Sequence, residues 1–277
     1  MRTLTNFLAF TFILSTSFVS AQTSETCNQN LSIFAESAKV KNYDAAYEPW
    51  NAVRAECPKL NRAIYTYGER ILKSRLKNAK GEAKDTEDQD LMKLYDQWIE
   101  NFPSRKGKNM IGSILASKAQ TMMDYKLGTT AEIYATFDEA YTKDINSFTN
   151  PKGLYNYFKT MHALFKAGAA GVTPEKLFNK YEEVSEKFEL EGTKLAKKLD
   201  VLLKKEESGS PLTTKDLKNR KKFDTNSKAI GIFLSNLDAI ISKESTCENL
   251  IPLYTRNFEQ NKNDAVWLNR AAGRMKS

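Results

Sequence analysis

An aromatic residue recurs at the centre of a short apolar pattern along this chain. In KNYDAAYEPWNAVRAECP, residues 41–58, Ala46, Trp50 and Val53 are separated by four and then three positions. Residues at these spacings lie on one face of an α-helix, so the stretch predicts an amphipathic helix with Trp50 on its buried face. The same spacing occurs in four later triplets: Leu91, Tyr95 and Trp98; Ile133, Phe137 and Ala140; Leu177, Tyr181 and Val184; and Leu250, Tyr254 and Asn257. The pattern therefore predicts a repeated helical unit.

A second pattern predicts the partner helix of some of these units. In RAIYTYGERIL, residues 62–72, Ile64 and Ile71 flank Tyr67-Gly68, and Gly68 permits a close crossing of two helices. Weaker copies of this pattern are Leu115, Ala119 and Met122, and Leu268, Ala271-Ala272 and Met275. We therefore expect an all-α fold of paired helices. An irregular helical bundle in which the spacing is accidental is the alternative.

The stretch 41–58 resembles the second helix of a tetratricopeptide repeat (TPR), which has small, aromatic and small residues before a closing proline, here Pro58. The resemblance covers most of residues 27–190 and 245–277, although the repeats vary in length. It implies an all-α, TPR-like solenoid of helical hairpins, closest to exported repeat proteins of Gram-negative bacteria. Such arrays present a concave groove, lined by first helices, that binds an extended peptide or a helix of a partner.

Residues 174–243 depart from the repeat and predict two long helices with near-heptad apolar spacing. SGSPLTT, residues 208–214, separates them, so we expect an antiparallel hairpin, with Thr173 as the N-cap of its first helix. Residues 191–228 hold 11 Lys and Arg against 6 Asp and Glu, a difference of +5. The expected organisation is a signal peptide over 1–21, TPR-like repeats over 22–190, an inserted basic hairpin over 191–243, and a further repeat with a terminal helix over 244–277.

The N-terminus has the parts of a cleavable secretory signal. Arg2 precedes an apolar run over residues 7–14, and Ala21 ends a small-x-small site before Gln22. We expect cleavage after Ala21; a retained anchor is the alternative, although the run is shorter than the roughly 20 residues of a membrane span. These features predict a chain exported to the periplasm or cell envelope, with no membrane span after cleavage.

Composition and charge narrow the function classes further. With 12 Gly and 7 Pro in 277 residues, the chain favours helices over sheet. Its net charge is +8, and export argues against a nucleic-acid partner for that charge. Solvated helix faces are the simplest interpretation of the excess, and contact of the basic hairpin with an anionic envelope surface is the alternative.

Three cysteines bear on the fold and the compartment. If helices pair within each repeat, Cys27 at the start of a first helix lies near Cys57 at the end of the second, so we expect a disulfide between them. Two free thiols are the alternative. Cys247 has no partner left, which suggests an intermolecular bond, a free thiol or a missing segment. The last expected helix, residues 268–275, is interpreted either as a cap or as a sign of truncation.

The sequence has few groups that indicate catalysis. His162 is the one histidine and lies in an expected helix, where a packing or surface role is more usual than catalysis. A metal or cofactor is not expected, since KDTEDQD, residues 84–90, lacks the Gly and terminal Glu of a calcium loop. We therefore expect a non-enzymatic scaffold that binds a peptide or protein partner. A glycan or nutrient-uptake accessory is the second interpretation, and a helical hydrolase of cell-wall glycan is the third.

The resemblance also suggests candidate groove residues. Some family members clamp a terminal carboxylate with Lys and Asn on adjacent first helices. The corresponding positions include Leu31 and Ala35 in the first repeat, so the clamp is not carried over. Tyr65, Glu69 and Lys118 are the candidate partner-binding residues, with solvated helix faces as the alternative.

Overall fold

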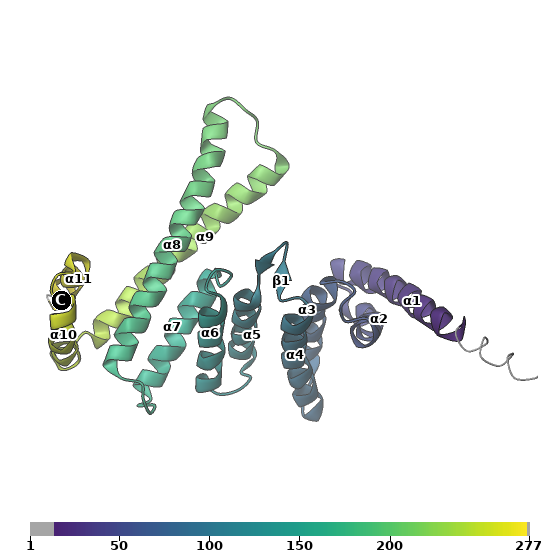
Figure 1. Cartoon of the computed structure of the whole chain (residues 1–277), viewed down its shortest axis with the longest axis horizontal. Coiled ribbons are helices and arrows are strands. Elements are labelled where there is room, and N and C mark those ends of the chain that lie inside the picture. Colours follow the sequence, from purple (N-terminus) through teal and green to yellow (C-terminus); the bar gives the residue numbers. More distant parts are fainter. Residues whose placement is uncertain (1–13, 276–277) are drawn as a thin grey trace, which may run out of the picture. The chain divides into compact units, whose positions relative to one another are not determined.

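The computed structural model describes residues 14–275 and is all-α apart from one small sheet (Figure 1). This confirms the predicted fold class at the level of secondary structure. The chain divides into two compact units, Met1–Met110 and Ile111–Ser277. Residues 1–13 of the expected signal segment lie outside the described part of the chain. The side chain of Asn257, from the last triplet, also lies outside it.

The described part of the first unit contains four helices and a short hairpin. The helices are α1 (Leu14–Lys39), α2 (Tyr43–Glu56), α3 (Ala63–Asn78) and α4 (Glu82–Asn101), followed by strands β1 (Ser104–Arg105) and β2 (Lys108–Asn109). Each helix packs against the next one in the chain. The strands are antiparallel, with Ser104 opposite Asn109, and the turn between them uses positive φ at Lys106 and Gly107.

Trp50 joins α2 to α3. Its side chain is fully buried, and its Nε1 donates a hydrogen bond of 2.6 Å to the carbonyl oxygen of Ile64. A Cβ at Gly68 would lie 2.6 Å from the same nitrogen, so α2 and α3 cross closely at this glycine. These two contacts of Trp50 lie between α2 and the following helix. Pro49 lies inside α2.

Cys27 and Cys57 form the expected disulfide between α1 and the end of α2, with their Cα atoms 6.4 Å apart. One expectation about it is wrong: Cys27 does not begin α1, because the helix extends back to Leu14. The disulfide instead joins the middle of α1 to the residue that caps α2.

The second unit contains seven helices in its described part. They are α5 (Ile111–Tyr125), α6 (Thr130–Asp144), α7 (Pro151–Lys166), α8 (Pro174–Glu207), α9 (Thr214–Glu244), α10 (Cys247–Asn261) and α11 (Ala265–Met275). At Gly112 the backbone of α5 meets that of α6 so closely that a Cβ would lie 2.0 Å from the carbonyl oxygen of Asp144. Buried rings of Phe137, Phe148 and Tyr157 pack where α6 meets α7.

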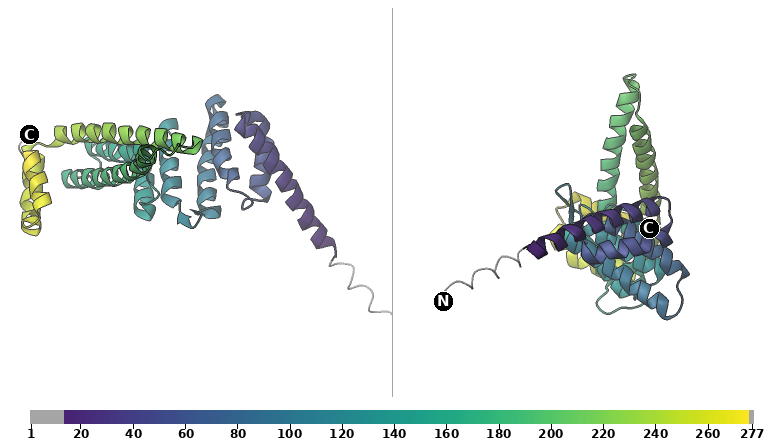
Figure 2. Two further views of the ribbon diagram at one scale, coloured as in Figure 1. Left: turned by 90° about the horizontal axis from the view of Figure 1, so that it is seen from above. Right: turned by 90° about the vertical axis from the view of Figure 1, so that its right-hand side faces the viewer.

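Helices α8 and α9 form a long antiparallel hairpin, whose turn lies away from α5 to α7 (Figures 1 and 2). Thr173 caps α8 as predicted, by accepting a hydrogen bond from the amide of Lys176. The backbone shows no break at the expected boundary between residues 190 and 191, since α8 runs through it with Phe188 and Glu191 both buried. The proximal part of the hairpin packs on α7, and the distal part extends beyond it.

Candidate binding surfaces

Of the three candidate groove residues, Tyr65 lies in the core of the first unit. Its side chain is fully buried, and its ring lies against Trp98 and Phe102. Its hydroxyl donates to the carbonyl oxygen of Pro58 at 3.0 Å and accepts from the Asn101 amide at 2.9 Å. Tyr65 can therefore support a binding surface only by holding its helices in place.

Glu69 and Lys118 are more accessible. Glu69, on α3, is partly exposed, pairs with Lys73 at 2.6 Å and accepts a hydrogen bond from Tyr95 at 2.9 Å. Lys118 is a partly exposed residue of α5, which belongs to the second unit. The structure thus leaves these two residues as candidate surface contacts on different units, and their role stays a prediction.

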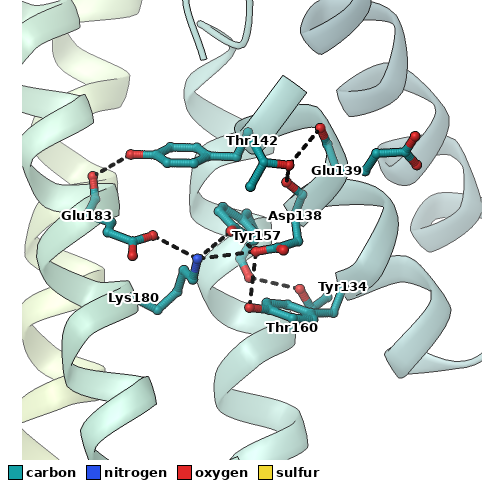
Figure 3. A network of polar contacts seen from close by, with 9 residues as sticks. Tyr134, Asp138, Glu139, Thr142, Tyr157, Thr160, Lys180 and Glu183 are labelled. Atoms are coloured by element: carbon teal, nitrogen blue, oxygen red, sulfur yellow. Dashed lines mark hydrogen bonds and ion pairs between the residues drawn. The ribbon is translucent and has the colours of Figure 1, made fainter. Parts of the chain in front are cut away.

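A polar network joins α6, α7 and α8 (Figure 3). Lys180 Nζ lies 3.2 Å from the Asp138 carboxylate, 2.7 Å from the Glu183 carboxylate and 2.5 Å from the Tyr157 hydroxyl. The Tyr157 hydroxyl donates to Asp138, and Tyr134 donates to the same carboxylate oxygen at 3.3 Å. The side chain of Lys180 is only 12% exposed, and its positive charge is paired with the carboxylates of Asp138 and Glu183.

The tyrosines of this network remain protonated. Burial, and then the hydrogen bond to Asp138, raise the pKa of Tyr157 far above its usual range. Burial also raises the pKa of Tyr141 to about 12, and its hydroxyl donates to the backbone oxygen of Glu183 at 3.0 Å. The phenols of Tyr157 and Tyr141 therefore act as hydrogen-bond donors between helices. Because these groups satisfy one another, the network is best explained as the polar support of the α6–α7–α8 packing.

His162 takes part in a smaller network at the end of α9. Its Nε2 lies 2.9 Å from a Glu244 carboxylate oxygen, and Lys166 Nζ lies 3.4 Å from the same oxygen. Burial opposes ionisation of Glu244, but the hydrogen bonds from His162 and Lys166 lower its pKa overall. The histidine therefore joins α7 to α9, which is a packing role, one of the two roles expected for it.

The distal hairpin, residues 195–228, has a different character. Among the described side chains of this segment, Leu202 alone is buried. Cations with an acidic partner include Lys205, which lies 2.8 Å from Asp216, and Arg220, which lies 2.5 Å from Glu206. Within the described part of the chain, no acidic side chain pairs with a further group of exposed lysines: Lys197, Lys198, Lys215, Lys218, Lys221 and Lys222. The distal hairpin therefore keeps an excess of positive charge in solvent.

A groove of about 440 Å³ lies between the two helices of the distal hairpin. Its lining consists of Leu199 and Leu203 from α8 and of Leu217, Arg220, Lys221 and Asp224 from α9. Leu203 is 37% exposed and Leu217 is 53% exposed, so these two leucines are uncovered. Sequence reasoning found the basic excess here but not the groove. The available signal was an apolar residue, Leu217, beside lysines and outside the stripe of α9 that faces α8.

No cluster of His, Cys, Asp and Glu able to hold a metal occurs within residues 14–275, and no helix in that range is long and apolar enough to cross a membrane. Comparison of the chain with protein-family models, curated proteins and solved structures finds no match.

Proposed function

We propose that this chain is an exported, non-enzymatic module that binds a protein partner, in which a TPR-like arrangement of helical pairs carries the inserted hairpin. The observation that carries the proposal is the leucine groove of the distal hairpin, which is also lined by Lys221, an exposed lysine that pairs with no acidic side chain in the described part of the chain. Apolar side chains that converge on a groove and remain in solvent are typical of a surface that a partner covers.

The packing of the helical pairs supports the TPR-like part of the proposal. The central aromatic residue of each of the first three triplets, Trp50, Tyr95 and Phe137, is fully buried. Gly68, which stands at the small position of the family pattern, lies at a close crossing of α2 and α3. Tyr181 differs, because it is only partly buried and its hydroxyl donates to Asp238 on α9. In the pair formed by α7 and α8, the central aromatic residue therefore contacts the hairpin helix α9.

Export is supported by the disulfide and by the expected signal sequence. Disulfides persist in oxidising compartments and are rare in the cytosol, so the Cys27–Cys57 bond is compatible with an exported chain. The pattern that ends at Ala21 adds a signal of the secretory type. We place the protein in the periplasm or cell envelope of a Gram-negative bacterium.

Capture followed by reconstitution tests this function. The purified chain, immobilised and incubated with envelope extract, should retain a protein in stoichiometric amount. The two purified components should then form a complex in analytical ultracentrifugation. Retention of purified envelope glycan, with no protein complex, would instead support a glycan-binding accessory. Release of soluble fragments from purified peptidoglycan would support a hydrolase, and either result would contradict the proposal.

A further inference from the structure

We infer that the distal hairpin binds an acidic amphipathic helix of a partner protein, with the apolar face of that helix seated on Leu199, Leu203 and Leu217. This inference rests on the proposed function and names the site and the chemistry of the partner. It follows from three properties of the distal hairpin: its shape, its charge and the directions of its apolar residues.

The shape of the groove favours a helix. The two sides of the groove are α-helices, and leucines from both of them line it. A third helix with apolar residues at every third and fourth position would contact both sides and complete a three-helix arrangement. A small ligand is disfavoured, because small-molecule sites enclose most of their ligand and Leu217 is 53% exposed.

The charge around the groove selects an acidic partner. Lys221 lines the groove, and Lys218 and Lys222 lie on the same helix, all three exposed and without an acidic partner among residues 14–275. Residues 191–228 carry 11 basic against 6 acidic side chains. A segment rich in Glu and Asp is therefore attracted to this surface. A second copy of the chain would bring the same positive charge and is repelled.

The directions of the apolar residues disfavour a membrane surface. Val201 is 65% exposed and lies two positions from both Leu199 and Leu203, so its side chain projects to a different side of α8. A helix that lies on a membrane keeps its apolar residues on one face. The exposed apolar residues of α8 do not share one face, whereas the three leucines converge on the groove.

A pair of designed peptides tests the inference on the full chain. The first is a fluorescent peptide of about 18 residues, or five helical turns, with leucines on one face and glutamates elsewhere. The second keeps the leucines and replaces every glutamate by lysine. The chain should bind the acidic peptide, measured by fluorescence anisotropy, and should bind the basic one at least about tenfold more weakly. Added salt should weaken the acidic complex.

Variants locate the site. Leu203→Ser/Leu217→Ser and Lys221→Glu/Lys222→Glu should each lower the affinity for the acidic peptide at least about tenfold. The control Lys59→Glu/Lys80→Glu makes the same change of charge at exposed lysines of the first unit and should bind like the unchanged chain. All of these side chains are exposed, so helical circular dichroism should be unchanged.

Several results would overturn the inference. The chain could fail to bind the acidic peptide, or the groove variants could bind it as tightly as the unchanged chain does. The unchanged chain could self-associate and lose this self-association in the groove variants. The chain could also bind phosphatidylglycerol vesicles more strongly than it binds the peptide. The variants also separate this inference from the proposed function. If Lys221→Glu/Lys222→Glu still captures the envelope partner with full affinity, protein binding stands and the hairpin site is wrong. If the peptide binds as expected but no protein partner is captured, the site stands and the proposed function is wrong.

Discussion

The indole of Trp50 fills the space that a side chain at position 68 would need. A Cβ built on Gly68 would lie 2.6 Å from Trp50 Nε1 and 2.7 Å from Cζ2. The same nitrogen donates to the Ile64 carbonyl one turn earlier on α3, so the ring cannot shift without loss of that hydrogen bond. The crossing of α2 and α3 therefore depends on a tryptophan and a glycine together.

Gly68→Ala should destabilise the first unit. Alanine favours a helix by about 1 kcal/mol over glycine, but overpacking against a buried ring costs about 1 to 3 kcal/mol and the hydrogen bond to Ile64 is lost in addition. We expect a net loss of about 1 to 3 kcal/mol, measured by urea denaturation. Gly231→Ala on α9 is the control, since nothing lies within 4 Å of a Cβ there. It should be neutral or stabilising, and equal effects of the two substitutions would contradict the close crossing.

Removal of the Cys27–Cys57 disulfide should also destabilise the first unit. The bond closes a loop with a sequence separation of 30 residues, which in a chain-entropy treatment stabilises the folded state by about 3 to 4 kcal/mol. Cys27→Ser/Cys57→Ser should lower the unfolding midpoint accordingly, whereas Cys247→Ser should not, because Cys247 is exposed and free. Alkylation of the unfolded chain should add one label without reductant and three with it. Three labels without reductant would refute the bond.

The sequence predicted those features that a local pattern or a single residue type determines. The period of apolar residues located the helices, and the placement of Cys27 and Cys57 predicted their bond. The same period could not place Tyr65, because a residue on a first helix is assigned to a groove or to the core by its neighbours. Here Asn101 and Phe102 at the end of α4 enclose it. Such contacts are set by packing between distant segments, which no local pattern reports.

The groove of the distal hairpin was hidden for a related reason. Leu199 belongs to the apolar stripe of α8. Leu203 and Leu217 line the groove together with Leu199 because the two helices leave space between them. That space depends on how far α8 and α9 separate. The spacing of apolar residues in each helix predicts which of its faces is buried. It does not show whether the neighbouring helix packs closely enough to cover that face.

Tyr157→Phe should destabilise the second unit if the network of Figure 3 is structural. The change removes a hydroxyl that donates to Asp138 and accepts from Lys180, and it leaves both groups with one partner fewer. We expect a loss of about 1 to 3 kcal/mol by urea denaturation. Tyr155→Phe, on the same helix, should have little effect, because its ring stacks on Phe233 at 4.9 Å and no hydrogen bond of its hydroxyl is described. A stable Tyr157→Phe variant with impaired partner binding would instead make the network a binding site.

Glu244 should make the stability of the second unit depend on pH. The hydrogen bonds from His162 and Lys166 outweigh the opposing effect of burial and hold the pKa of the folded carboxyl below 4.5, its value in the unfolded chain. A lowered folded pKa means that the unfolded state binds protons first as the pH falls. The contribution of Glu244 is therefore complete above pH 4.5 and is lost as the pH drops through the folded pKa. The difference in melting temperature between the unchanged chain and Glu244→Gln should thus be largest near about pH 5.5 and shrink towards about pH 3. Glu189→Gln removes an exposed carboxylate of α8 and should have little effect at either pH. A difference for Glu244→Gln that grows on acidification would show that its carboxylate is not stabilised by α7.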